Sequence, residues 1–204
     1  MLFEDIYKTI ATTGKGSFRD RGSKFISFAI PVKDEEEIKE ALKGLKKEFY
    51  NATHHCYAWL LGSDKLAFRM NDDGEPSGSA GRPILGQIQS KDLTNVLVVV
   101  IRYYGGTNLG VPGLINAYKT SAREALDNAQ VLEKTVNDIY EIQFHYPHMN
   151  DVMRIMKDEK LEQVNHCFQD NCSIVFSVRK NDSARVHDSI VKIDGVKVEY
   201  LRTE

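Results

Sequence analysis

Three carboxylates lie close together in a short glycine-rich segment, residues 72–83, which reads DDGEPSGSAGRP. Clustered carboxylates suit general acid–base catalysis, or a divalent cation held by oxygen ligands. The segment lacks the ligand spacing of an EF-hand, and no second carboxylate cluster accompanies it. The sequence therefore favours turns and internal ion pairs, in which Arg82 or Arg102 neutralises the acidic residues Asp72, Asp73 and Glu75.

A second glycine-rich segment, residues 102–113, reads RYYGGTNLGVPG and leads into a helical pattern. Backbone N–H groups at a helix N-terminus attract anions, an arginine there adds a charge-assisted hydrogen bond, and tyrosines stack on nucleobases. The sequence leaves open the alternative that the glycines only make a tight strand-to-helix turn. The candidate binding residues of this segment are Arg102, Tyr103, Tyr104, Gly105, Gly106, Asn108 and Gly110.

The two segments flank an apolar run, residues 95–101, which predicts a central strand covered on both faces. Around it, periodicity predicts strands over residues 25–32, 54–61 and 65–70, a helix over residues 35–48, and helices that begin near residues 82 and 114. These elements must hold the two segments. We expect them to belong to one N-terminal domain.

The strand predicted over residues 54–61 begins with two histidines and a cysteine. Adjacent strand residues point to opposite faces, so His54 and His55 are poorly placed to chelate one ion. His54 and Cys56 share a face, but the sequence shows no third group that would orient them for nucleophilic catalysis. We therefore expect no metal, no cofactor and no catalytic residue.

The first 21 residues have weak periodicity, and residues 12–24, TTGKGSFRDRGSK, predict a loop. This loop holds four cations, Lys15, Arg19, Arg21 and Lys24, against the single carboxylate of Asp20. A solvated arm is the favoured interpretation, and a contact with an anion is the alternative.

Residues 134–204 follow a pattern of their own. Alternating and helical segments predict the order β-α-β-β-α-β, the ferredoxin-like split unit, with a hairpin turn at Asp170-Asn171. The sequence thus predicts an α+β chain of two domains, residues 1–133 and 134–204.

Composition limits the broad class of the protein. The 204 residues carry a net charge of −2, so a strongly basic nucleic-acid-binding body is excluded, although a local basic patch is not. Three cysteines without a CxxC pattern argue against a disulfide framework or a cysteine zinc site. No apolar run approaches the roughly 18 residues of a membrane span. We expect a cytoplasmic protein without a membrane partner.

The chain resembles the Impact family, also called the YigZ-like family, at DDGEPSGSAGRPIL and VVVIRYYGGTNLGVPGLINAY. KFI near Lys24, HHCYAW at His54 and the ferredoxin-like C-terminal pattern support the resemblance, which covers essentially the whole chain. The chain departs from the family pattern at Asn108 and Asn116, where the family commonly carries lysine and arginine, respectively. Two cations that would grip phosphate are therefore absent.

The resemblance implies an N-terminal Impact domain, similar to the ribosomal-protein-like α/β sandwich that forms domain IV of elongation factor G. It also implies a C-terminal ferredoxin-like domain. For eukaryotic relatives it implies control of translation initiation under amino-acid starvation. For bacterial members of this layout it implies a translation-associated or RNA-binding role without an established reaction.

The first functional hypothesis is a non-enzymatic binding protein associated with regulation of translation. Its glycine-rich loops and Arg82 would contact RNA, the ribosome or a translation-regulating protein. The alternative is a hydrolase of a small anionic or peptide substrate bound between the loops, with Asp72, Asp73 and Glu75 as reactive carboxylates and Arg102 as anion clamp. A protein-only adaptor with an exposed apolar patch is a third hypothesis.

Overall fold

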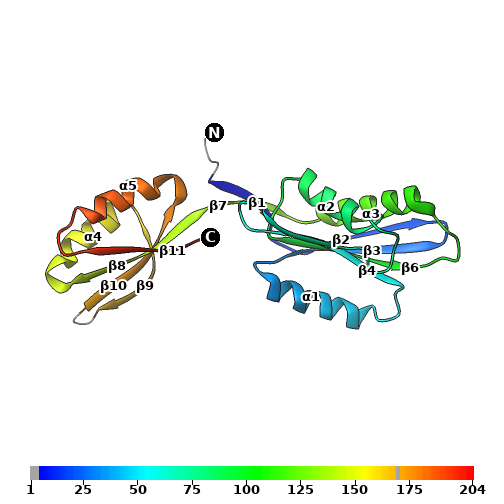
Figure 1. Cartoon of the computed structure of the whole chain (residues 1–204), viewed down its shortest axis with the longest axis horizontal. Coiled ribbons are helices and arrows are strands. Elements are labelled where there is room, and N and C mark those ends of the chain that lie inside the picture. The colour runs from blue at the N-terminus through cyan, green and yellow to red at the C-terminus, as the bar shows by residue number, and fades with distance from the viewer. Residues whose placement is uncertain (1–4, 169–170) are drawn as a thin grey trace. The chain divides into compact units, whose positions relative to one another are not determined.

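The computed structural model describes residues 5–168 and 171–204, so the predicted turn at Asp170 lies outside the described residues (Figure 1). The contacts within the chain divide it into two compact units. One contains residues 7–134, and the other contains residues 135–204 together with Asp5 and Ile6. Both combine sheets with helices, which confirms the predicted α+β class with two domains.

The first unit is built on a five-stranded antiparallel sheet with β6, Val96–Tyr103, at its centre. Every residue of β6 except Tyr103 is buried, so the predicted central strand covered on both faces is confirmed. The strand order is β2-β3-β6-β4-β5. The other four strands are β2 (Gly14–Asp20), β3 (Ser23–Pro31), β4 (His54–Leu61) and β5 (Ala67–Asn71).

Helices cover both faces of this sheet (Figure 1). In β3, Phe25 and Ala29 pack beneath two helices, whereas Ile26 and Phe28 point to the other face and a third helix. This alternation follows from the two-residue repeat of a strand. The two helices on the first face are α2 (Gly81–Ser90) and α3 (Gly110–Asp127), and the helix on the second face is α1 (Glu35–Glu48).

Helix α1 has the bounds that the sequence predicted, because its start is encoded locally. The Asp34 carboxylate accepts hydrogen bonds of 2.9 Å from the backbone N–H groups of Glu36 and Glu37. These are two of the donors that a helix start leaves without partners. Ile38 and Leu45 then face the core at helical spacing.

The loop predicted over residues 12–24 is wrong, because these residues form β2 and the start of β3. Strand β1, Ile6–Ile10, precedes them. A Cβ added at Gly14 would lie 2.0 Å from the Ala125 carbonyl oxygen, and one at Gly16 would lie 2.7 Å from the Ala125 nitrogen. The two glycines therefore let α3 approach β2 closely, whereas their usual meaning in a sequence is a turn. Strand β1 pairs with β7, Val131–Thr135, which the sequence pattern also missed.

The second unit has the predicted order β-α-β-β-α-β, in one sheet of order β11-β8-β10-β9. Its core lies between one face of the sheet and two helices, and includes Ile142, Ile174 and Phe176. No helix among residues 5–168 and 171–204 is long and apolar enough to cross a membrane. The elements are β8 (Asn137–His145), η1 (Tyr146–His148), α4 (Met149–Asp158), β9 (Glu162–Phe168), β10 (Asn171–Arg179), α5 (Lys180–Val191) and β11 (Lys197–Thr203).

Candidate functional site

Strand register brings the two glycine-rich segments to the same end of the five-stranded sheet. The first segment follows the end of β5, where Asn71 pairs with Tyr57 of β4. The second begins at the end of β6, where Arg102 pairs with His54 at the start of β4. Since β4 lies between β5 and β6, both loops leave the sheet at its β4 start.

A buried ion pair joins the two loops. The Arg102 guanidinium donates through Nη1 to Glu75 Oε1 at 2.5 Å, and the side chains are only 5% and 4% exposed. The Tyr118 hydroxyl of α3 donates to the same oxygen at 2.7 Å. Burying a carboxylate is costly unless it is paired and hydrogen-bonded, and Glu75 has both kinds of partner. Glu75 therefore fastens the first loop to β6 and α3.

Ser23 extends this network to the start of β3. Its hydroxyl oxygen accepts from Arg102 Nη2 at 3.3 Å and from the Gly105 backbone N–H at 3.2 Å. The Arg102 guanidinium also lies over the rings of Phe25 and Tyr104, 5.5 and 5.4 Å from their centroids. Buried among these partners, Arg102 positions the loops and is not part of the exposed surface.

The two aspartates of the first loop are also held by backbone groups. The Asp72 carboxylate accepts from the N–H groups of Gly78, Ala80 and Gly81 at 2.8, 3.0 and 2.8 Å, so it orders the start of α2. Asp73 Oδ2 accepts from the His55 N–H at 2.6 Å. Both carboxylates stabilise the loop conformation, as the sequence favoured for this cluster.

His54 and Cys56 share a face of β4, but their partners do not activate a nucleophile. The Cys56 thiol donates to the Asp72 carbonyl oxygen at 3.0 Å, and it is fully buried. Burial raises the pKa of this thiol far above its usual range, so it stays protonated. His54 Nδ1 donates to the Asp73 carbonyl oxygen at 2.8 Å, and its Nε2 lies 3.8 Å from Glu75 Oε1.

The outer side of the second loop is exposed. Tyr104 is 47% exposed, and its hydroxyl donates to Asn108 Oδ1 at 3.2 Å across the loop. Gly106 and Gly110 have φ values of +82° and +72°, which favour glycine. Arg82 is exposed in the first turn of α2 and has no ion-pair or hydrogen-bond partner within the described residues.

Tyr103 does not belong to this surface. Successive strand residues point to opposite faces, so Tyr103 lies on the α1 face, where its hydroxyl donates to Asn51 Oδ1 at 3.0 Å. The structure thus divides the sequence-predicted residues into three groups. Asp72, Asp73, Glu75 and Arg102 form the internal framework, Tyr104, Gly106, Asn108, Gly110 and Arg82 are exposed, and Tyr103 lies on the other face.

The remaining predicted residue, Gly105, makes a backbone contact that the sequence did not suggest. A Cβ at Gly105 would lie 2.0 Å from the carbonyl carbon of Gly22, in the turn between β2 and β3. Only a residue without a side chain allows this approach. The sequence did not predict three residues of the site, Ser23, Gly22 and Tyr118, because they lie far from the loops in the chain.

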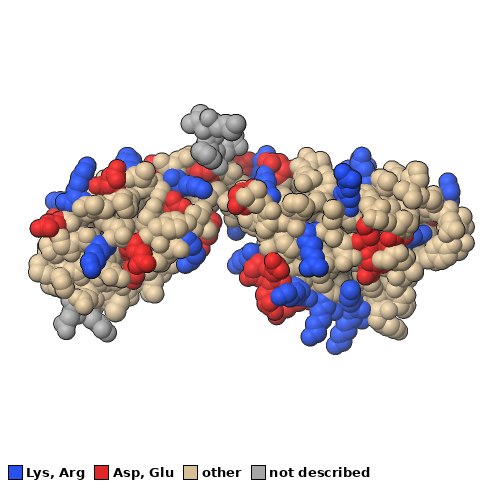
Figure 2. All heavy atoms as spheres, in the orientation of Figure 1, with Lys and Arg blue, Asp and Glu red and all other residues tan. Residues whose placement is uncertain are grey.

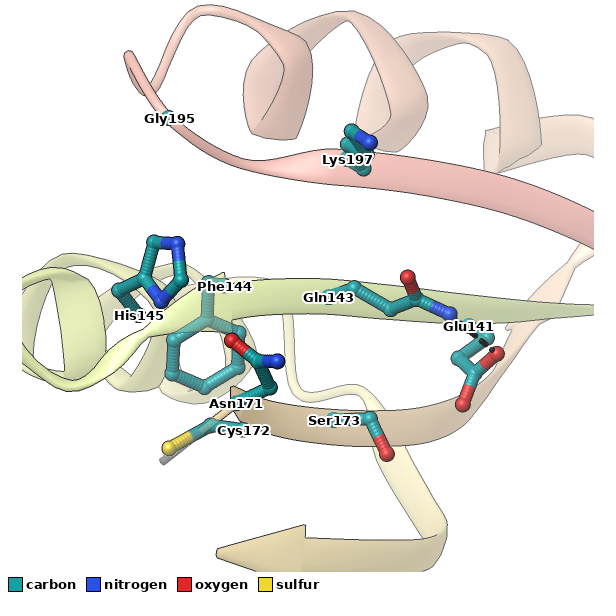
Figure 3. A pocket seen from close by; sticks show the side chains of 9 residues that line it. All are labelled: Glu141, Gln143, Phe144, His145, Asn171, Cys172, Ser173, Gly195 and Lys197. Carbon is teal, nitrogen blue, oxygen red and sulfur yellow. Dashed lines mark hydrogen bonds between the residues drawn. The ribbon is translucent and has the colours of Figure 1, made fainter. Parts of the chain in front are cut away.

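The second unit contains a separate pocket of about 540 Å³ at one end of its sheet (Figure 3). Glu141, Gln143 and Ser173 lie along the sheet there, and the Gln143 amide donates to Glu141 at 3.1 Å. Lys197 is the one cation of the lining. No motif marks this pocket in the sequence, because its residues come from three strands and the turn before β11: Glu141, Gln143, Phe144, His145, Asn171, Cys172, Ser173, Gly195 and Lys197.

Comparison with known proteins places the chain among established relatives. The IMPACT family member YvyE of Bacillus subtilis is 34% identical over 154 residues, which are 76% of this chain and 71% of that protein. The Saccharomyces cerevisiae protein named Protein IMPACT homolog is 35% identical over 120 residues, 57% of this chain and 46% of that one. A crystal structure of a hypothetical protein shares the fold, with a TM-score of 0.75 at 24% identity over 98% of this chain and 99% of that chain.

The profile of the Impact N-terminal domain matches residues 21–126, which contain both glycine-rich loops and the buried pair of Glu75 and Arg102. The match spans about half of the chain. Together with the identity to YvyE, it shows that the chain belongs to the IMPACT family.

Proposed function

We propose that this chain is a non-enzymatic binding protein associated with the regulation of translation. The outer side of its second loop, with Arg82, contacts RNA, the ribosome or a translation-regulating protein. One observation carries the proposal above all. The reactive groups of the loops are engaged in internal contacts, while Tyr104 remains exposed.

The contacts of the loop carboxylates support binding in preference to hydrolysis. A general acid or base must reach the proton that it transfers. Glu75 is enclosed by Arg102 and Tyr118, and the Asp72 carboxylate accepts three backbone hydrogen bonds. The thiol of Cys56 is buried and protonated, which removes the nearest nucleophile from consideration.

The geometry of the second loop supports a contact surface. The Tyr104 ring lies on the Arg102 guanidinium, and its hydroxyl is held by Asn108, so the ring is fixed before a partner arrives. Ordering an aromatic side chain in advance lowers the entropic cost of binding. An exposed, fixed tyrosine suits stacking on an unpaired base or packing against a protein surface.

Family membership supports the link to translation. The resemblance to the Impact family implies control of translation initiation for its eukaryotic relatives, and the yeast relative carries the family name. The matched region of this chain contains the loops that form the proposed surface.

Co-sedimentation with ribosomes across a salt series tests the proposal. We expect wild-type protein to associate at low salt, with less association as salt rises. Tyr104→Ala and Arg82→Ala should weaken association without loss of folding, because both side chains are exposed. Lys192→Ala is the control, since it removes an exposed cation without an ion-pair partner from the second unit. Equal association of all four proteins would exclude the loop surface, and no association at low salt would exclude the ribosome.

A further inference from the structure

We propose that the β2–β3 hairpin contains a binding site for the phosphodiester backbone of a single-stranded nucleic acid. The site lies on the sheet face that α1 covers, and its central residues are Arg19, Arg21 and Lys24. The proposal rests on the proposed function and gives one of its partners a chemical class. It uses residues outside the loop surface, so the two can be tested separately.

A like-charge pair across the hairpin is the first observation. Arg19 of β2 and Lys24 of β3 are directly opposite in the strand register, so they lie on the same face with their Cβ atoms about 5 Å apart. Like charges in this position destabilise a hairpin. Neither side chain has an ion-pair or hydrogen-bond partner within the described residues. A bound anion would remove this repulsion.

The one carboxylate of the hairpin cannot neutralise this pair from its own side. Asp20 pairs with Ser23, so it lies on the opposite face of the two strands from Arg19 and Lys24. The Ser23 hydroxyl on that face is already bonded to Arg102 and Gly105. One face of the hairpin therefore presents the unpaired cations Arg19 and Lys24, whereas Ser23 on the other face belongs to the Arg102 network.

The turn residue Arg21 adds a third cation in an unfavourable backbone conformation. Arg21 and Gly22 have φ values of +44° and +80°, as in a type I′ turn, where asparagine, aspartate or glycine is preferred at the first position. An arginine in the left-handed region costs conformational energy. An arginine at the tip of the hairpin is explained if its guanidinium binds a ligand. Arg21 also lacks an ion-pair partner within the described part of the chain.

A hollow of about 380 Å³ lies at the tip of the hairpin, and residues 19–24 line it, so the three cations share it with Asp20, Gly22 and Ser23. The row continues across the sheet, because Lys24 pairs with Tyr103 of β6 on the same face. Along β2, Lys15 shares the face of Arg19, and a rise of ~3.4 Å per residue places the two about 14 Å apart. Cations spread along a strand beside an aromatic ring fit a chain of phosphates with a stacked base better than one small anion.

Charge placement on α1 is consistent with this choice. The first turn of α1 holds Glu35, Glu36 and Glu37, and its last turn holds Lys46 and Lys47. In Figure 2, acidic atoms gather at one end of this helix and basic atoms over the rest of it. The last turn leads to Asn51, which accepts the hydrogen bond of Tyr103. The basic end of α1 is thus the end near the cationic row.

Binding of a fluorescently labelled oligouridylate of about 12 nucleotides, followed by anisotropy across a salt series, tests the site. Arg19→Glu converts the like-charge pair into an opposite-charge pair with Lys24. We expect it to reduce affinity at least tenfold at low salt, while Tm stays the same or rises. For each lost contact, the slope of log affinity against log salt should become shallower by about 0.7. Lys119→Glu makes the same charge change at an exposed residue of α3 without an ion-pair partner, and should bind like wild type.

The outcomes separate this site from the proposed function. Equal binding by Arg19→Glu and Lys119→Glu would overturn the hairpin site, as would polyglutamate that competes as well as unlabelled oligouridylate. Oligothymidylate that binds as well as the RNA would support the phosphodiester class. Failure of the wild type to bind either oligonucleotide would overturn the inference. Ribosome association and its dependence on Tyr104 would then still decide the proposed function.

Discussion

The Glu75 carboxylate and the Arg102 guanidinium form a buried ion pair that joins the two glycine-rich loops. The residues are 27 positions apart in the chain. Around them, the hydroxyl groups of Tyr118 and Ser23 provide hydrogen bonds from α3 and β3. The pair therefore links the first loop to the strand from which the exposed second loop begins.

Breaking the pair from one side should destabilise the first unit strongly. Glu75→Ala or Arg102→Ala leaves a buried charge without its partner, which costs about 3–5 kcal/mol. Urea unfolding of the single variants and of the double variant would measure the coupling energy. The double variant should lose clearly less than the sum of the two. For comparison, the exposed pair of Lys39 and Glu36 should contribute about 0.5 kcal/mol or less. Additive single effects would mean that the two side chains do not interact.

Stability should fall in mildly acidic solution because of His55. Burial lowers the pKa of this imidazole below its usual value of about 6.5. The effect of burial is larger than that of the nearby Asp73 carboxylate, which raises the pKa. The unfolded chain therefore binds a proton at a pH where the folded protein still excludes it. The free energy of unfolding should decrease as pH falls through about 6.5. His55→Gln should flatten this part of the pH profile in urea titrations. An unchanged profile would show that other groups dominate.

The cysteines should differ sharply in reactivity. Cys56 is fully buried with a raised thiol pKa, whereas Cys167 is exposed. Native protein treated with iodoacetamide near pH 8 should be alkylated at Cys167 and spared at Cys56, as mass spectrometry of the peptides would show. Denaturation before treatment is the control, and it should expose both thiols. Rapid alkylation of Cys56 in native protein would reopen the thiol as a catalytic group.

The contact between Gly22 and Gly105 should tolerate no side chain. In Gly105→Ala, the new methyl group would overlap the Gly22 carbonyl, and overpacking of this kind costs about 1–3 kcal/mol. Gly44→Ala is the matched control, because a Cβ there meets no atom within 4 Å. It lies in α1, where alanine is favoured over glycine by up to about 1 kcal/mol. Thermal unfolding should therefore shift in opposite directions for the two variants.

The sequence could predict the elements whose cause is local. Helix α1 begins where Asp34 caps it, and β4 has the predicted bounds, because their signals lie within a few residues. Strand β2 was missed because its glycines have a tertiary cause. Gly14 and Gly16 are needed because α3 packs closely against β2, and α3 begins more than 90 positions later in the chain.

The site was only partly predictable for the same reason. The loop residues stood out by composition, but whether Arg82 or Arg102 neutralises the acids depends on strand register. Tyr118 fitted the apolar face of α3, so nothing in its spacing marked the hydroxyl that reaches Glu75. Tyr103 and Tyr104 are adjacent in sequence, yet they belong to opposite faces of the sheet.

Hydrogen exchange of the full chain, with and without ribosomes at low salt, tests the central claim most directly. If the outer side of the second loop is the contact surface, amides of residues 104–109 should gain protection on binding. The buried amides of β6 should not change, because they are already protected in the sheet. Protection confined to the second unit, or none near residues 104–109 despite association, would contradict the account.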